Sequence, residues 1–262
     1  MWWIKNKTLV RESGLLEGGC DYHCHLLPGV DDGVKEMEET LEILEIWEQA
    51  GLKEVWLTPH IMEDIPNKPA ALKAKAEELR KAYNGPIQLH LAAEHMMDGL
   101  MMKRMEEDEL MPYINGNDNE NQNENGMLLV ETSYYIPPMN MEEFINRIKK
   151  KGYDPVLAHP ERYQYMGTND YKRWKNEGVL LQLNLPSVVG AYGPEVQRKA
   201  EWLLNQGMYD LCGTDTHSIN HVDYFMNSSI NKKIERKIRP LLTSMRPLLT
   251  SPKQGRLGGV HS

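Results

Sequence analysis

Cysteine is scarce in this chain of 262 residues. The three cysteines are Cys20, Cys24 and Cys212, and no two of them form a CxxC pair. A small, odd set of this kind argues against a disulfide framework and indicates a reducing compartment.

Long apolar stretches are also missing. No run approaches the roughly 20 residues that a transmembrane helix needs. The first residues, "MWWIKNKTLVRESGLLEGG", lack the apolar core of a signal peptide. Together these absences predict a cytoplasmic protein with no transmembrane segment.

Positive charge is in deficit, because 30 lysines and arginines face 38 aspartates and glutamates, for a net charge of -8. Nucleic-acid-binding domains usually carry basic patches, so this balance argues against a nucleic-acid partner. The chain also lacks the glycine fingerprint of dinucleotide-binding folds and the P-loop lysine motif. With 40% hydrophobic and 26% charged residues, it has the composition of an ordinary globular protein.

Short apolar runs alternate with amphipathic stretches along most of the chain. Strands are predicted to end at His25 and to lie at 53–60, 86–95, 126–135, 154–160, 178–187 and 208–217, and helices at 33–51, 68–85, 140–152 and 194–207. Strands alternating with helices indicate a parallel α/β fold. About seven such units favour a barrel over an open sheet.

Two segments depart from this alternation. Residues 115–126, "NGNDNENQNENG", are too polar to be buried and are predicted to form a surface loop. Residues 239–262 begin with the duplication "RPLLTSMRPLLTS" and continue with prolines and glycines, so we expect an irregular tail. The remainder, 1–238, is predicted to form one barrel domain.

The stretch "DYHCHLLPGVDDG", residues 21–33, places His23 and His25 two positions apart. Side chains alternate along a strand, so both rings are expected on one side and Cys24 on the other, as a packed thiol. Asp215 and His217 in "GTDTH" repeat this spacing near the end of the last predicted strand.

In a parallel barrel the carboxyl ends of the strands converge, so the residues at these ends are expected to share one site. The acids and imidazoles at the predicted strand ends are His23, His25, His60, Glu94, Glu131, His159, Asp215 and His217. Each taken alone has an ordinary reading as an exposed or hydrogen-bonded residue. Unpaired charge at buried strand ends is costly, however, and a metal cluster would satisfy all of them. Nitrogen and oxygen ligands without thiolate suit Zn, Mn or Fe.

The combined motifs resemble a known group. "DYHCHLLPGVDDG", "WLTPH", "AAEH", "LLVETSYYIPP", "LAHPERY" and "GTDTH" are similar to motifs of the polymerase and histidinol phosphatase (PHP) superfamily. They most closely resemble its bacterial metal-dependent tyrosine-protein phosphatases of the capsular polysaccharide type, from about Gly14 to about Tyr224. This resemblance implies a distorted seven-stranded (β/α) barrel of PHP type, with the metal site at the carboxyl ends of the strands.

The resemblance also implies two to three divalent transition metal ions, with Mn preferred and Fe or Zn as alternatives. The implied ligand sets are His23, His25, Asp215 and a bridging Glu94 for the first ion, Glu94, Glu131 and His159 for the second, and Asp32, His60 and His217 for the third. Asp32 is preferred as a ligand to its neighbour Asp31, for which a turn or helix cap is the alternative.

Arg162, in "HPERY", resembles the phosphate-binding arginine of this family. Its guanidinium is suited to bind two phosphoryl oxygens, although a surface salt bridge is the ordinary alternative. The family usually places a second arginine after the DxH pair, where this chain has Asn220 in "SINHVDYF". The second phosphate contact is therefore left open.

The implied reaction is hydrolysis of a phosphate monoester by water activated at the metal ions. A cysteine nucleophile is not expected, because Leu26, Val30 and Ser218 stand where the arginine of a Cys-x5-Arg loop would follow the three cysteines. The implied partner is a phosphotyrosine protein, in particular a polysaccharide co-polymerase tyrosine kinase.

Three alternatives stay open at this point. They are a small-molecule phosphatase of the histidinol-phosphate type, a polymerase-associated exonuclease module, which the acidic balance disfavours, and a weakly active metal-binding regulatory module. Whether the chain forms an oligomer is also left open.

Overall fold

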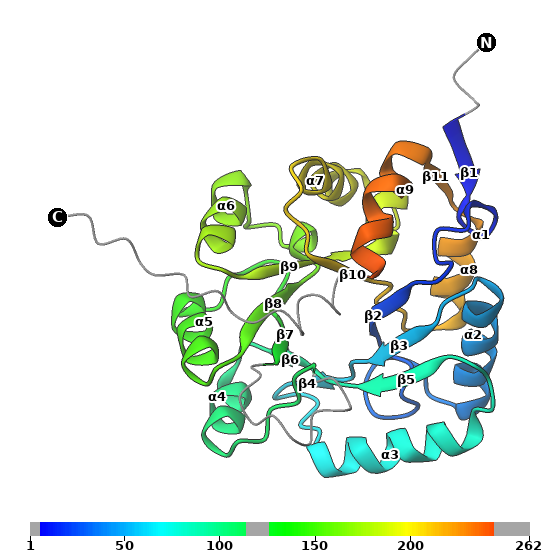
Figure 1. Ribbon diagram of the computed structural model, residues 1–262. Helices are drawn as coiled ribbons and strands as arrows, with labels where there is room; N and C mark the ends of the chain where they lie inside the picture. The colour runs from blue at the N-terminus through cyan, green and yellow to red at the C-terminus, as the bar shows by residue number, and fades with distance from the viewer. Residues whose placement is uncertain (1–5, 114–125, 244–262) are drawn as a thin grey trace.

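The computed structural model describes residues 6–113 and 126–243. It has a mixed α/β fold built on a curled parallel sheet (Figure 1). Six strands form the larger part, in the order β10 (Leu211–Gly213), β9 (Leu180–Asn184), β8 (Asp154–Ala158), β7 (Met127–Glu131), β6 (Glu94–Met96) and β4 (His60–Ile61). The smaller part has the order β2 (Cys20–Cys24), β3 (Glu54–Leu57) and β5 (Gln88–Leu91).

The two parts of the sheet meet where β2 lies beside β10 and the segment that follows it. The backbone N–H of Asp215 donates to the carbonyl of His23 over 2.7 Å, and the N–H of His25 donates to the carbonyl of Thr216 over 2.9 Å. This pairing sets the HxH segment against the DxH segment, although about 190 residues separate them in the chain.

The strands predicted at 53–60 and 86–95 are each interrupted, so their prediction as continuous strands was wrong. β3 ends at Leu57 and β4 starts at His60, with Pro59 between them, whose missing N–H cannot join a ladder. β5 likewise ends at Leu91, with two residues between it and the start of β6 at Glu94. Beyond each break the chain joins the larger part of the sheet, where His60 and Glu94 lie in register on neighbouring strands.

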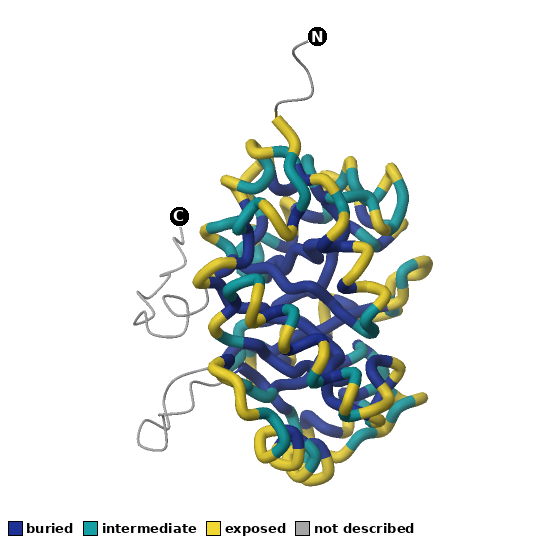
Figure 2. The backbone as a smooth tube through the Cα atoms, turned by 90° about the vertical axis from the view of Figure 1, so that its right-hand side faces the viewer, coloured by how far each residue is buried: buried dark blue, intermediate teal, exposed yellow. Residues whose placement is uncertain are grey.

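Helices surround the strands on the outside (Figure 1). They are α1 (Val10–Ser13), α2 (Met37–Gln49), α3 (Pro69–Ala82), α4 (Gly99–Glu106), α5 (Met141–Lys150), α6 (Thr168–Asn176), α7 (Pro194–Asn205), α8 (Ile219–Asn227) and α9 (Lys232–Ile238), with the 3-10 turns η2 (Pro160–Arg162), η3 (Leu185–Val189) and η4 (Arg239–Leu242). The four predicted helices are confirmed as α2, α3, α5 and α7. In Figure 2 the buried residues form the centre of the molecule, and the exposed ones lie on the helices and loops around it.

α2 shows why these segments are helical. Ile43, Leu44 and Trp47 follow each other at helical spacing and are buried, while the glutamates between them face outward. The helix starts four residues later than predicted. Gly33 is packed against His25, where a Cβ would lie 2.2 Å from the His25 carbonyl oxygen, so this segment belongs to the loop under the site.

The pairing near the two ends of the described chain was not predicted from the sequence. β1 (Lys7–Leu9) pairs antiparallel with β11 (Ser229–Asn231). At the start of the predicted tail, η4 buries Leu242. Residues 244–262 of that tail, and all but the last residue of the predicted 115–126 loop, lie outside the described residues. Among the helices that are described, none has the length and apolar character to span a bilayer.

Candidate metal centre

The predicted ligands converge on one pocket at the carboxyl ends of the strands. This pocket, of about 540 Å³, is lined by Asp32, His60, Met62, Glu94, Met96, Glu131, Tyr134, His159, Arg162, Tyr192, Asp215, His217, Ser218 and His221. His23 and His25 are fully buried beside these residues. The predicted clustering of acids and imidazoles is therefore present in the structure.

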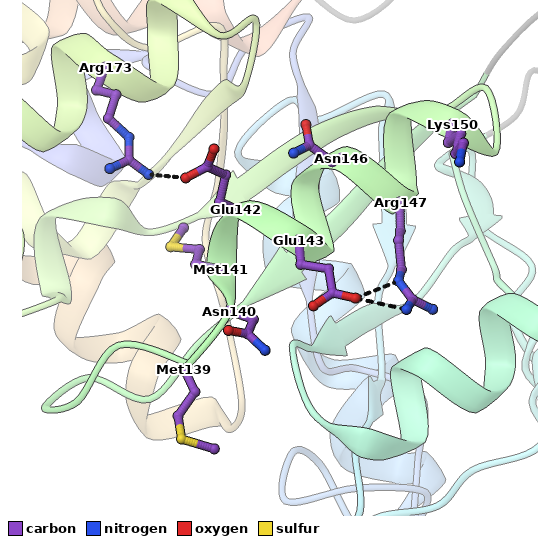
Figure 3. A pocket seen from close by; sticks show the side chains of 9 residues that line it. All are labelled: Met139, Asn140, Met141, Glu142, Glu143, Asn146, Arg147, Lys150 and Arg173. Carbon is purple, nitrogen blue, oxygen red and sulfur yellow. Dashed lines mark hydrogen bonds and ion pairs between the residues drawn. The ribbon is translucent and has the colours of Figure 1, made fainter.

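A larger pocket, of about 840 Å³, lies on the outer surface along α5 and beside Arg173 of α6 (Figure 3). Four of its charged side chains form pairs, Glu143 with Arg147 at 2.7 Å and Glu142 with Arg173 at 3.7 Å. The described residues that line it include neither imidazole nor thiol. The chemistry of the chain is concentrated in the smaller pocket.

Strand alternation places the first ligand pair as predicted. The Nε2 atoms of His23 and His25 lie 3.0 Å apart, and Asp215 Oδ1 lies 3.5 and 3.3 Å from them. Cys24 is buried on the other side, in the hydrophobic core.

Two of the predicted ligands have strained backbones. His159 has a φ of 34° and Asp215 a φ of 52°, and only Asp108 joins them as a non-glycine residue with positive φ in the described chain. Left-handed backbone is costly for such residues and is typical of functional sites. The fold here holds two side chains where local preference would not place them.

Three groups of ligand atoms lie close enough together to hold a metal ion, each within 4.8 Å. They are His23, His25 and Glu94; His60, Glu94 and Glu131; and His25, Asp32, His60 and His217. These sets differ from those implied by the family resemblance. His60 joins Glu94 and Glu131, where His159 was expected, and His159 also lies near both carboxylates, with its Nε2 3.1 Å from Glu94 Oε1 and 3.9 Å from Glu131 Oε2.

The group of His60, Glu94 and Glu131 has the features expected of a cation site. His60 Nδ1 lies 3.2 Å from Glu94 Oε2 and 3.0 Å from Glu131 Oε1. All three atoms are buried, and none makes a hydrogen bond within the described residues. Buried polar atoms are nearly always bonded, so three converging unbonded ones indicate a missing partner. Their chemistry fits a divalent ion such as Mn, Fe or Zn.

The charges of the site depend strongly on each other. Burial lowers the pKa of His23, but Glu94 and Asp215 outweigh it and raise this pKa to about 9. Burial raises the pKa of Glu94, but His23 and His60 outweigh it and hold the pKa well below its usual value. Protonated imidazoles thus balance ionised carboxylates, and a bound cation would replace those protons.

We therefore expect more than one divalent ion per chain, bound with release of protons. Affinity for Mn should rise with pH until His23 loses its proton near pH 9, because metal and proton compete for the same nitrogen. Titration calorimetry in two buffers of different ionisation enthalpy measures the released protons, and elemental analysis measures the stoichiometry. One ion or fewer per chain after Mn loading, or binding independent of pH, would contradict this expectation.

Asp31 has a role that the sequence analysis did not assign. Its Oδ2 accepts from His25 Nδ1 at 2.8 Å and from the backbone N–H of His60 at 3.0 Å, and its Oδ1 accepts from the N–H of Gly33. A carboxylate on the far nitrogen of a ligand histidine fixes the orientation of its ring. The side chain of Asp32, by contrast, is largely exposed, and its Oδ1 lies 3.4 Å from His60 Nε2.

Two amides on β9 were also missed. Gln182 Oε1 lies 2.6 Å from His23 Nδ1, and Asn184 Nδ2 donates to Asp215 Oδ2 at 2.8 Å. The signal was present in the sequence as two polar residues, two positions apart, in the apolar run "VLLQLNLP". Their spacing points both toward the same interior as the ligands.

Arg162 is the last residue of η2, the short turn that starts directly after His159, and its side chain lines the pocket. Its Nη1 donates to Asp215 Oδ2 at 2.7 Å. Asn220 is exposed at the start of α8 and is not among the residues lining the pocket, whereas His221 is.

The chain is similar to known proteins over most of its length. The tyrosine-protein phosphatase YwqE of Bacillus subtilis is 24% identical over 238 residues, covering 87% of this chain and 90% of YwqE. The tyrosine-protein phosphatase CpsB of Streptococcus pneumoniae is 23% identical over 223 residues, covering 80% of this chain and 87% of CpsB.

The fold has a counterpart among solved structures. One of the crystal structures of YwqE and CpsB, described as unique metal-dependent tyrosine phosphatases, matches with a TM-score of 0.72 and 22% identity, covering 88% of this chain and 93% of the other. The model of the family for capsular polysaccharide synthesis, CpsB/CapC, matches residues 19–244. The chain belongs to the CpsB/CapC family.

Proposed function

We propose that this chain is a metal-dependent protein-tyrosine phosphatase that acts in the cytoplasm. Its proposed substrate is a phosphotyrosine protein of capsule or exopolysaccharide assembly, in particular a polysaccharide co-polymerase tyrosine kinase. The observation that carries the proposal is the single pocket lined by candidate metal ligands and by Arg162. Relatives named tyrosine-protein phosphatases, which match most of the chain, support it.

The proposal includes the finer architecture. Counting β3 with β4, and β5 with β6, as two interrupted strands gives a distorted seven-stranded barrel. Support for this count comes from the contact between β2 and β10, which brings the two outer strands together. We place the barrel domain at residues 1–238.

We assign the ligand roles to nine residues: His23, His25, Asp32, His60, Glu94, Glu131, His159, Asp215 and His217. They are proposed to hold two to three divalent ions, with Mn preferred. When bound, such ions act as Lewis acids and lower the pKa of a water molecule. Asp31 and Gln182 orient His25 and His23 through their far nitrogens.

Arg162 is the proposed phosphate-binding residue. Its Nη1 is held by Asp215, and its Nε and Nη2 make no hydrogen bond within the described chain. These two remaining donors suit two phosphoryl oxygens. A fixed guanidinium stabilises charge that develops on the transferred group, which is a large contribution in phosphoryl transfer.

A protein substrate is favoured by the loop that follows Glu131. Tyr134 of this loop lines the pocket, while Tyr135, Ile136 and Met139 are 69%, 70% and 100% exposed. These side chains follow Tyr134 in the chain, and exposed apolar groups of this kind are typical of contacts with a protein. A free amino-alcohol phosphate would not need them.

Comparison of substrates tests the proposal. The Mn-loaded protein should hydrolyse a phosphotyrosine peptide with a higher kcat/KM than either a phosphoserine peptide or histidinol phosphate, because the loop offers apolar contacts to the peptide. Steady-state phosphate release with each substrate measures this. A far higher kcat/KM for histidinol phosphate would assign the site to small molecules instead.

Activity is also expected to need metal and no thiol. Cys20, Cys24 and Cys212 are buried, and burial raises the pKa of each thiol well above its usual value, which leaves little thiolate to react. Chelator should abolish hydrolysis of p-nitrophenyl phosphate, whereas iodoacetamide should have little effect. Loss of activity on alkylation with the metals retained would count against metal-activated water.

A further inference from the structure

Arg162 lies between two aromatic rings. Its guanidinium carbon is 4.3 Å from the centre of the Tyr134 ring and 4.2 Å from the centre of the Tyr192 ring. Tyr134 comes from the loop after β7, and Tyr192 from the loop after η3, so segments distant in the chain meet at this arginine. Both rings line the metal pocket.

Both tyrosines are themselves held in place. Tyr192 accepts a hydrogen bond at its hydroxyl from Asn184 Nδ2, which also donates to Asp215 Oδ2. Tyr134 stacks on Tyr163 with ring centres 6.1 Å apart. The arginine, the Tyr192 ring and the predicted ligand Asp215 are thus joined in one network.

We propose that Tyr134 and Tyr192 are positioning residues that hold the Arg162 guanidinium ready for the phosphoryl group. The inference rests on the proposed function and deepens it by adding two residues that act through Arg162. An arginine side chain has high rotamer entropy, and the two ring faces with Asp215 remove much of that freedom before substrate arrives. Nε and Nη2 make no hydrogen bond within the described chain and stay available to the phosphoryl group at the pocket that Arg162 lines.

The expected effect follows from the strength of cation–π contacts. A partly desolvated contact is worth between about 1 and 2 kcal/mol, which corresponds to about 5- to 30-fold. Tyr134→Ala and Tyr192→Ala should each lower kcat/KM for a phosphotyrosine peptide by this factor. The inhibition constant of inorganic phosphate should rise by a similar factor in both variants.

Further variants separate this role from a structural one. Tyr134→Leu and Tyr192→Leu keep an apolar side chain but offer no π face, so their kcat/KM should fall as much as that of the alanine variants. Tyr134→Phe and Tyr192→Phe should recover most of the loss. Tyr224 of α8 is 51% exposed, does not line the metal pocket and makes no contact with Arg162 within the described chain, so Tyr224→Ala serves as the control and should behave as the wild type.

The decisive measurement is a double-mutant cycle with Arg162→Ala. If the tyrosines act through the arginine, adding Tyr134→Ala or Tyr192→Ala to the Arg162→Ala protein should lower kcat/KM by less than about twofold, because the arginine that they position is already absent. Mn content and melting temperature are measured on every variant. An equal loss in the presence and absence of Arg162, or Tyr134 and Tyr192 variants whose activity matches that of Tyr224→Ala, would overturn the inference.

Failure of the proposed function would look different. In that case the Mn-loaded wild-type protein would not hydrolyse the phosphotyrosine peptide and would not bind inorganic phosphate in a calorimetric titration. If it does both while the tyrosine variants stay unaffected, the phosphatase assignment stands and only the positioning role is lost.

Discussion

Glu94→Gln is expected to abolish metal-dependent phosphatase activity. Glu94 is fully buried, and its Oε2 lies 3.2 Å from His23 Nε2 and 3.2 Å from His60 Nδ1. It belongs to two of the three groups of candidate ligands, so its loss should weaken metal binding at both. Removing one charge from a buried cluster costs about 3–5 kcal/mol, or roughly 100- to 5,000-fold in affinity.

The matched control is Glu54→Gln. Glu54 pairs with His90 at 3.1 Å on the same sheet, away from the metal pocket, so this variant also removes a carboxylate from an imidazole. Elemental analysis after Mn loading and gel filtration, together with rates on p-nitrophenyl phosphate, measures both variants. A Glu94→Gln protein with wild-type Mn content and rate would remove Glu94 from the metal centre.

Arg162→Ala is expected to lower kcat/KM by about 100- to 1,000-fold, the usual effect of removing a charged donor from a developing anion. Arg162 also donates to Asp215, so its loss touches a predicted metal ligand. Asn184 still donates to the same Asp215 oxygen in the variant. We therefore expect most of the Mn content to be retained, so that the loss falls on the reaction and not on metal binding.

Arg173→Ala is the matched control for this variant. Arg173 also lies over an aromatic ring, at 4.3 Å from the Trp174 ring centre, and pairs with glutamate, but it lines the outer pocket of Figure 3. Its activity should equal that of the wild type. Near-wild-type turnover by Arg162→Ala would leave phosphate binding to the metal ions alone. If Mn content and activity fall together, Arg162 acts by holding the side chain of Asp215 in place.

Much of the candidate site follows from local sequence patterns. The two-residue period of a strand puts His23 and His25 on one side and Cys24 on the other, whatever the rest of the chain does. The same two-residue period also applies to Gln182 and Asn184, which are polar residues inside an apolar strand and therefore point to the interior that the ligands share. Asp31 was harder to assign, because a carboxylate in a turn has the same sequence signal whether it caps a backbone or orients a histidine.

Other features depend on contacts between distant segments. Two breaks, after β3 and after β5, move His60 and Glu94 onto neighbouring strands, which brings His60 to Glu94 and Glu131, where His159 also lies. Strand propensity says nothing about such a break except through Pro59. The pairing of β1 with β11 likewise joins segments more than 200 residues apart, neither of which has a strong strand pattern.

The sequence by itself determined the kind of chemistry: imidazoles and carboxylates at strand ends, no reactive thiol loop and an arginine after the HP pair. These are properties of residue type and spacing, which strand geometry converts directly into direction. The tertiary structure alone decided which candidate ligands lie within reach of one another and how Arg162 is held between Tyr134 and Tyr192. Such contacts arise because packing of the whole sheet sets distances of a few ångströms between loops, and no local pattern encodes them.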